Sequence, residues 1–174
     1  KKCVQRFNNR FKPIGVLSID ESNTVYLYPD YKFYNKIYGK YLSYDMQKYL
    51  KLRAKYNTMS GLGLNMLIKP KTMADRIADF EKLYLYSNDS NIKELCEKIV
   101  FDDVRKFIFS PSIYATSTQE MSNEFEQAYK YFISSKKTSA LRPLFMSYLD
   151  KKKNYSEANF KNDYPYKFFN PESI

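Results

Sequence analysis

The feature that most constrains the fold of this chain is a pattern typical of β-strands over residues 14–28. Two runs rich in β-branched, aliphatic and aromatic residues, 14–19 and 24–28, flank the turn-forming segment 20–23. Two such runs separated by a short turn predict a β-hairpin. Residues 64–68 form a further apolar run, which predicts a third strand. Most of the remaining chain follows helical periodicity, so a small sheet has to pack on helices.

Five segments predict helices. Residues 40–57 place apolar side chains on one broad face at about 100° per residue, namely Tyr38, Leu42, Met46, Tyr49, Leu52 and Tyr56. Two further helices are expected from Thr72 to about Tyr86, and from Asn91 to the residues before Ser110. The last two begin at the capping box of residues 117–120 and at Pro143, the latter ending at Lys152.

The two ends of the chain differ from its centre. Residues 1–12 are polar and basic, whereas residues 153–174 are rich in Asn and contain six aromatic residues and two prolines. Because proline interrupts regular structure, we expect an extended arm whose aromatic side chains dock on a surface. The predicted fold is mainly helical α+β. A basic arm over 1–12 precedes one globular domain over 13–152, in which the hairpin, with or without the third strand, packs on four or five helices, and the aromatic arm over 153–174 follows.

The chain contains no histidine and only two cysteines, Cys3 and Cys96. This excludes a conventional structural zinc site, which needs four closely spaced ligands, and every catalytic relay that uses an imidazole. Catalysis would have to use Asp, Glu, Lys or Tyr. The two distant cysteines favour a reducing intracellular compartment, while the start at Lys1 leaves open a removed leader. No apolar run approaches the length of a transmembrane helix, so none is expected.

The net charge of +10 is distributed unevenly. Residues 1–70 hold 13 basic and 4 acidic side chains, residues 71–135 hold 8 and 11, and residues 136–174 hold 8 and 4. Basic ends around an acidic centre indicate a polyanionic partner, either nucleic acid or an acidic protein surface, or a contact between the ends and the centre. Lys, Tyr, Phe and Asn share A/T-rich codons, so an A/T-rich genome is an alternative source of the lysine excess.

A stripe of lysines follows the predicted helix 40–57. Lys40, Lys48, Lys51 and Lys55 fall on a second face of this helix, with Tyr44 among them. Lysines at this spacing can contact successive phosphates, and a tyrosine can stack on a base. These five residues are therefore candidates for nucleic-acid binding. The alternative is the solvated face of an amphipathic helix in a lysine-rich protein.

Two carboxylates near the hairpin are candidate metal ligands. Asp20 ends an apolar strand that a second strand follows, an arrangement that resembles the first hairpin of ribonuclease-H-like nucleases. Asp30 and Lys32 form an Asp-x-Lys motif that resembles that of restriction-type nucleases, in which an upstream acid, here Asp20 or Glu21, shares the metal. The resemblance implies Mg²⁺-dependent cleavage, for which oxygen ligands suffice. Aspartates are also common in turns for structural reasons alone.

Three functional interpretations follow. We expect a non-enzymatic binding or assembly subunit that needs no cofactor and docks on nucleic acid, or on a larger viral, phage or organellar assembly. It would use its basic ends, and its aromatic arm would bind a protein partner. The second interpretation is a Mg²⁺-dependent nuclease that uses Asp20, Asp30 and Lys32. The third is an exported or surface protein whose leader was removed.

Overall fold

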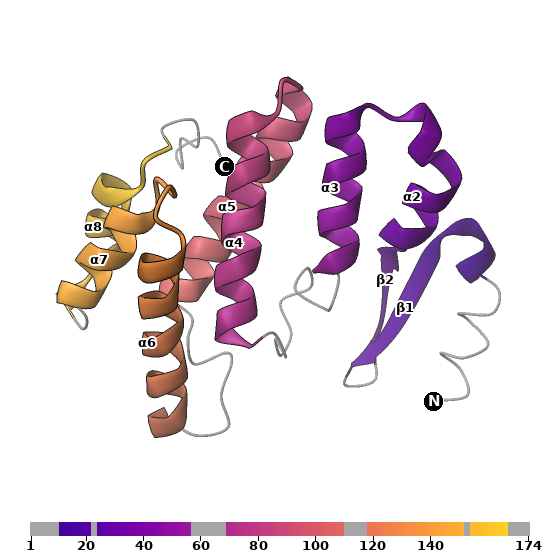
Figure 1. The fold of residues 1–174 in the computed structure, drawn as a ribbon. Coiled ribbons are helices and arrows are strands. Elements are labelled where there is room, and N and C mark those ends of the chain that lie inside the picture. The colour runs from indigo at the N-terminus through magenta and orange to yellow at the C-terminus, as the bar shows by residue number, and fades with distance from the viewer. Residues whose placement is uncertain (1–10, 22–23, 57–68, 110–117, 152–153, 167–174) are drawn as a thin grey trace. The chain divides into compact units, whose positions relative to one another are not determined.

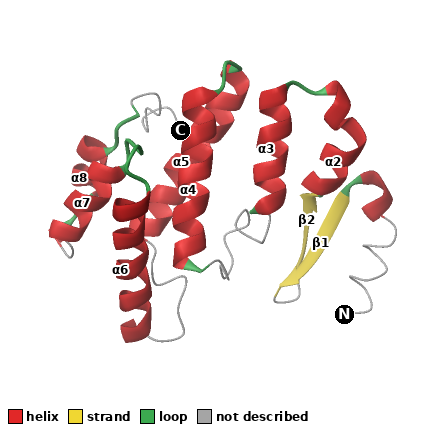
Figure 2. Cartoon of the chain, in the orientation of Figure 1, coloured by secondary structure: helices red, strands yellow, loops and turns green. Residues whose placement is uncertain are grey.

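The computed structural model describes residues 11–21, 24–56, 69–109, 118–151 and 154–166. The chain divides into two compact units, Lys1–Leu67 and Ile68–Ile174, whose elements are drawn in Figures 1 and 2. The fold is mainly helical α+β, as predicted, and the strands in the described part of the chain belong to the N-terminal unit. The predicted third strand lies outside the described residues, and the predicted domain bounds stay a prediction.

A β-hairpin opens the described part of the N-terminal unit. It consists of β1 (Val16–Glu21) and β2 (Thr24–Pro29), which are antiparallel and paired along their full lengths, as the two β-type runs predicted. A 3-10 turn, η1 (Lys12–Ile14), leads into β1 through Gly15, whose φ is 78°. A Cβ atom at this position would lie 2.5 Å from a ring carbon of Phe33. Glycine is thus required here for both its backbone conformation and its size.

Two helices follow the hairpin and run side by side, as Figure 1 shows. They are α2 (Tyr31–Tyr38) and α3 (Tyr44–Lys55), joined by the 3-10 turn η2 (Gly39–Tyr41). The predicted helix over 40–57 therefore begins four residues late, because η2 turns the chain and Ser43 then caps α3 by accepting a 3.2 Å hydrogen bond from a first-turn N–H. The helix α2 was not among the predicted elements.

The described part of the C-terminal unit is helical. Its helices are α4 (Pro70–Tyr86), α5 (Ser90–Phe109), α6 (Thr118–Ser135), α7 (Arg142–Lys151) and α8 (Glu157–Asp163). Both α5 and α6 pack on α4, α7 packs on α6, and α8 packs on α7. The first four of these helices were predicted. The helix α4 begins at Pro70 rather than at the predicted Thr72, because proline suits the first position of a helix. None of the described helices combines the length and apolar character that crossing a bilayer requires.

Aromatic side chains dominate the core of the C-terminal unit. The fully buried ones are Phe80, Phe107, Phe132, Phe145 and Phe160. The Phe107 ring lies 4.6 Å, between centroids, from Tyr129, whose hydroxyl donates a 2.6 Å hydrogen bond to the Phe107 carbonyl oxygen. The polar tip of this buried tyrosine is thereby satisfied. On α5, Ile92, Cys96 and Val100 are buried, whereas Leu95, at the same helical spacing, is 41% exposed.

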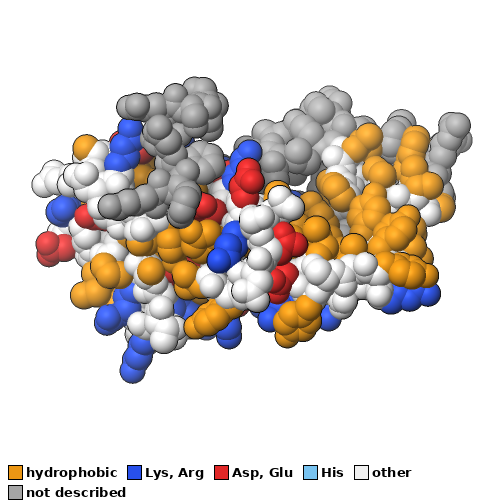
Figure 3. Space-filling view, turned by 90° about the horizontal axis from the view of Figure 1, so that it is seen from above, with side chains coloured by type: hydrophobic (Ala, Val, Ile, Leu, Met, Phe, Trp, Pro, Cys, Tyr) orange, Lys and Arg blue, Asp and Glu red, His pale blue; other side chains and the backbone are white. Residues whose placement is uncertain are grey.

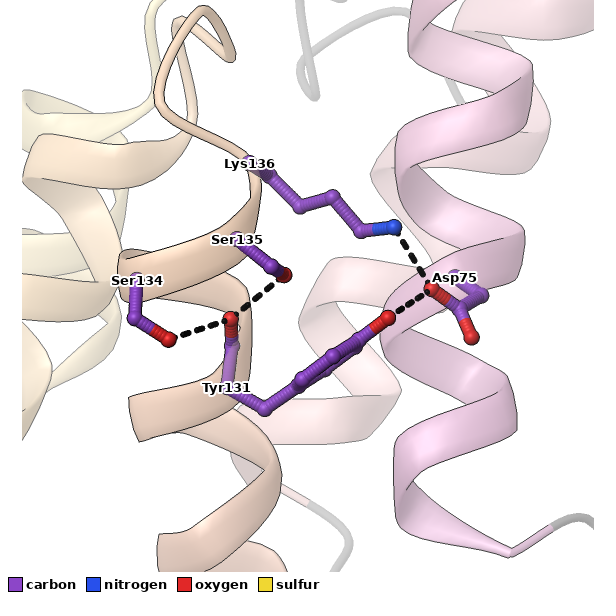
Figure 4. A network of polar contacts seen from close by, with 5 residues as sticks. All are labelled: Asp75, Tyr131, Ser134, Ser135 and Lys136. Atoms are coloured by element: carbon purple, nitrogen blue, oxygen red, sulfur yellow. Dashed lines mark hydrogen bonds and ion pairs between the residues drawn. The ribbon is translucent and has the colours of Figure 1, made fainter.

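Polar contacts connect α4 to the two helices beside it. Arg76 of α4 and Asp103 of α5 form an ion pair with 2.6 Å between Nε and Oδ2, and both side chains are almost completely buried. Asp75 of α4 accepts a 2.8 Å hydrogen bond from the Tyr131 hydroxyl and pairs with Lys136 at 2.6 Å. Figure 4 shows that Tyr131 and Lys136 both reach Asp75 from α6 and its C-terminal end. These contacts fix α4 against both neighbours.

The prediction of an extended arm over 153–174 is wrong for residues 157–163, which form α8. Ser156 and Asn159 make a reciprocal capping box at the start of this helix, which satisfies backbone donors that an extended chain would leave to water. Pro165 follows the helix and does not interrupt it.

The aromatic residues around α8 dock within their own unit. Tyr155, Phe160 and Tyr164 are buried, and the last two rings lie 5.7 Å and 5.3 Å from Phe101 of α5. The aromatic side chains of the arm were expected to dock on a surface, and for these residues that surface belongs to their own chain. Residues 167–174, and with them the remaining predicted contacts of the arm, lie outside the described residues.

Candidate functional site

The structure does not bring the predicted nuclease carboxylates together. Asp20 lies near the turn of the hairpin, where its backbone pairs with Val25, whereas Asp30 follows β2 at the opposite end. Asp30 N–H bonds to the Gly15 carbonyl oxygen, so five residue steps of the hairpin, about 16 Å, separate these two levels. Ligands of a shared Mg²⁺ have to approach it to about 2.1 Å. Among the described residues, no group of three or more His, Cys, Asp and Glu side chains could hold a metal ion.

The Asp-x-Lys motif is the start of α2. Oδ1 of Asp30 accepts hydrogen bonds of 3.0 Å and 3.1 Å from the backbone N–H groups of Lys32 and Phe33. A carboxylate at this position satisfies unpaired donors and faces the positive end of the helix dipole. Asp30 therefore has a structural role as the N-cap of α2. The Lys32 side chain is exposed and lines a pocket between α2 and α3.

A basic pocket opens between α2 and α3. Its volume is about 400 Å³, and its lining comprises four lysines, one asparagine and one alanine: Lys32, Asn35, Lys36, Lys51, Ala54 and Lys55. The four lysines are exposed to solvent, and no carboxylate is among the lining residues. Each helix contributes two lysines spaced by four residues, which places each pair on one helical face. The pocket can therefore surround one anionic group with ammonium groups from both helices.

An arginine holds the two pocket-forming helices together. Nη2 of Arg53 on α3 donates a 2.8 Å hydrogen bond to the Tyr31 hydroxyl, and the guanidinium lies 4.7 Å from the centroid of the same ring. The guanidinium also lies 5.9 Å from the ring of Tyr49, which is buried. Because Tyr31 is the first residue of α2, these contacts place the start of α2 beside the C-terminal half of α3. These contacts hold together the two helices that line the pocket.

Two exposed tyrosines lie in η2 and at the start of α3, outside the pocket lining. Tyr41 in η2 is 75% exposed and Tyr44 at the start of α3 is 70% exposed. Lys40 Nζ lies 4.7 Å from the centroid of the Tyr41 ring, and Lys48 Nζ lies 4.2 Å from that of Tyr44. Figure 3 shows hydrophobic side chains, with tyrosine counted among them, gathered over the N-terminal unit. Two accessible rings, each paired with an ammonium group, therefore accompany the lysine pocket.

The predicted lysine stripe is only part of this site. Lys51 and Lys55 line the pocket, whereas Lys40 and Lys48 lie beside the exposed tyrosines. Lys36, and the position of Lys32 in the pocket, were not predicted because α2 was not predicted. The available signals were Asp30 as a cap and apolar residues at helical spacing in 31–38.

A second polar cluster, in the C-terminal unit, is structural. The buried Glu81 carboxylate accepts hydrogen bonds from the Tyr166 hydroxyl at 2.5 Å and from the backbone N–H of Leu141 at 3.3 Å. Burial raises the pKa of Tyr166, and its hydrogen bond to Glu81 raises it further. Burial also raises the pKa of Tyr164, to which the nearby carboxylates Glu97 and Glu81 add. A tyrosine with a raised pKa keeps its proton, so Tyr166 acts here as a hydrogen-bond donor to Glu81.

Comparisons with models of protein families, with curated proteins and with solved structures gave no match to this chain.

The distribution of charge gives an independent indication of where a polyanion would bind. The unit Lys1–Leu67 holds 12 basic and 4 acidic side chains, whereas the unit Ile68–Ile174 holds 17 and 15. Most of the net charge of +10 thus belongs to the unit that contains the pocket.

Proposed function

We propose that the N-terminal unit binds nucleic acid and holds phosphate groups in the pocket between α2 and α3. The observation that carries this proposal is that four lysines and no carboxylate line one open pocket. Four lysines around one pocket concentrate positive charge there, which favours an anionic ligand. Phosphate contacts made by lysine also release counterions condensed on the nucleic acid, which drives binding at low salt.

The lining residues suit phosphate oxygens in particular. A lysine ammonium is a compact charge with three donors, and Asn35 adds an amide that can donate to a further oxygen. The proposed role is binding without catalysis, because the lining supplies neither a carboxylate to hold a metal ion nor a general base near a bound phosphate. The protein would act as a subunit that attaches to nucleic acid or to a larger nucleoprotein assembly.

The salt dependence of binding tests this proposal. Fluorescence anisotropy would measure the affinity for a labelled oligonucleotide, as a single strand and as a duplex, over a range of salt concentrations. Each phosphate contact contributes about 0.7 for a single strand, or 0.9 for a duplex, to the slope of log K against log salt. The double variant Lys36→Gln/Lys51→Gln should therefore reduce the slope by about 1.4 or 1.8, respectively. Lys82→Gln/Lys98→Gln, at exposed lysines of α4 and α5, is the matched control and should leave the slope unchanged.

Three results would overturn the proposal. The first is no binding of either oligonucleotide at about 50 mM salt, where phosphate contacts are strong. The second is a slope that the pocket variant leaves unchanged. The third is equal affinity for polyglutamate and for the oligonucleotide, which would identify an acidic protein surface as the partner. Circular dichroism of both double variants would confirm that they are folded, as expected for substitutions at exposed positions.

A further inference from the structure

We infer that the pocket belongs to a binding site for single-stranded nucleic acid, in which bases stack on Tyr41 and Tyr44 while phosphates follow the lysines. This inference rests on the proposed function and specifies its ligand. It uses two observations that the pocket alone does not provide, namely the alignment of residues along α3 and the exposure of the two tyrosine rings.

Tyr44 lies on the same face of α3 as the lysines of the pocket. At the 3.6 residues per turn of a helix, Tyr44, Lys48, Lys51 and Lys55 fall within about 60° of the circumference and extend over about 16 Å. Lys51 and Lys55 line the pocket, so Tyr44 and Lys48 continue the same face toward the start of the helix. Successive phosphates of one strand in a duplex lie about 3.4 Å apart along the axis, and those of an extended single strand lie further apart, so this face is long enough for at least two nucleotides.

The exposed rings are positioned as stacking surfaces. A tyrosine usually buries its ring and leaves its hydroxyl in water, whereas Tyr41 and Tyr44 expose most of their surface. Lys40 and Lys48 lie over these rings, at 4.7 Å and 4.2 Å from the centroids. Each pair therefore offers an aromatic surface for a base and, next to it, a cation for a phosphate.

A single strand fits this arrangement better than a duplex. The bases of a duplex are stacked on one another and present only their edges in the grooves, so an exposed ring cannot stack on them along the helix. A single strand exposes the face of every base, and stacking on an aromatic side chain tolerates any sequence. A row of lysines accompanied by exposed aromatic rings is thus suited to single strands with little sequence preference.

Binding of the full chain to one oligonucleotide, as a single strand and as a duplex, distinguishes the two ligands. Tyr41→Ala and Tyr44→Ala should each weaken binding of the single strand by roughly 5- to 150-fold, and leave the affinity for the duplex unchanged. Tyr44→Phe keeps the ring and should bind like the wild type. Tyr86→Ala removes a tyrosine of α4 that is 73% exposed, and it is the matched control.

The outcomes separate this inference from the proposed function. Equal binding of both oligonucleotides, with no loss in the Tyr41→Ala and Tyr44→Ala variants, would overturn the inference and leave the proposed function standing. No binding of either oligonucleotide would overturn both. A loss in Tyr44→Phe as large as that in Tyr44→Ala would show that the hydroxyl rather than the ring matters, and would overturn stacking at this position.

Discussion

Removal of one partner of the buried ion pair between Arg76 and Asp103 should destabilise the C-terminal unit more than removal of both. Their Nε and Oδ2 atoms are 2.6 Å apart, and the side chains are only 8% and 4% exposed. Asp103→Asn preserves the shape of the side chain but replaces the carboxylate that pairs with the buried arginine by a neutral amide. Loss of one partner from a buried pair costs about 3–5 kcal/mol, which is a large part of the stability of a domain.

The double variant Arg76→Met/Asp103→Leu removes both charges together with the cost of burying them. Apolar pairs of similar volume often replace a buried ion pair with no loss of stability. We therefore expect the double variant to be more stable than Asp103→Asn and close to the wild type. The assay is urea unfolding followed by circular dichroism, in which an unchanged m-value would confirm that the midpoint reports stability.

Two results would refute this reasoning about the ion pair. A loss below about 1 kcal/mol in Asp103→Asn would be typical of an exposed pair, and would mean that the interior does not isolate the arginine from water. A double variant as unstable as Asp103→Asn would mean that other contacts of Arg76 outweigh the pair. One such contact is with the ring of Phe80, whose centroid lies 5.8 Å from the guanidinium carbon.

Two further predictions concern backbone conformation and alkaline pH. Gly15→Ala should lower the unfolding free energy of the N-terminal unit by at least about 1 kcal/mol, because the φ of 78° and the Phe33 ring both oppose a Cβ atom. Gly39→Ala is the control and should be neutral or stabilising, because its Cβ atom would meet no atom closer than 3.5 Å. An equal loss of unfolding free energy in both variants, measured by urea unfolding, would contradict this account of Gly15. Burial, together with nearby carboxylates, raises the pKa of Tyr155 and Tyr164 in the folded chain. The unfolded chain therefore loses these protons first above about pH 10, and stability should fall there by up to about 1.4 kcal/mol per pH unit for each tyrosine; equal urea midpoints at about pH 9 and pH 11 would contradict it.

Local sequence patterns predicted the elements whose formation depends on neighbouring residues. The hairpin followed from two β-type runs around a turn, and α5 from apolar residues at helical spacing that include the buried Ile92 and Val100. Leu95 has the same spacing but is 41% exposed, because the width of a buried face depends on how many helices cover it. The two prolines near the C-terminal end suggested an extended arm, whereas Pro165 follows a helix that Ser156 had already capped.

The candidate site could be predicted only in part, because it joins two helices. The lysines of α3 were visible as a stripe at helical spacing. Their proximity to Lys32 and Lys36 depends on the turn η2 and on the contact of Arg53 with Tyr31, 22 residues apart, which no local pattern contains. Asp20 and Asp30 show the converse case. The sequence suggested that these two carboxylates share a metal ion, but the register of the hairpin places the two residues at opposite ends of it.

The two hydrogen bonds that Glu81 accepts bear on the order in which the units fold during translation. Its carboxylate is buried in α4, yet the donors come from Leu141 and Tyr166, 60 and 85 residues further along the chain. These two donors are synthesised late. A carboxylate without hydrogen-bond donors is more stable in water than in an apolar core. We therefore expect the core of the C-terminal unit to form only when nearly all of its described helices have been synthesised. In the N-terminal unit β1 packs on β2 and α2 on α3, all from neighbouring segments. A nascent chain therefore forms its lysine pocket before its second unit is complete, and the proposed attachment to nucleic acid would not have to wait for that unit.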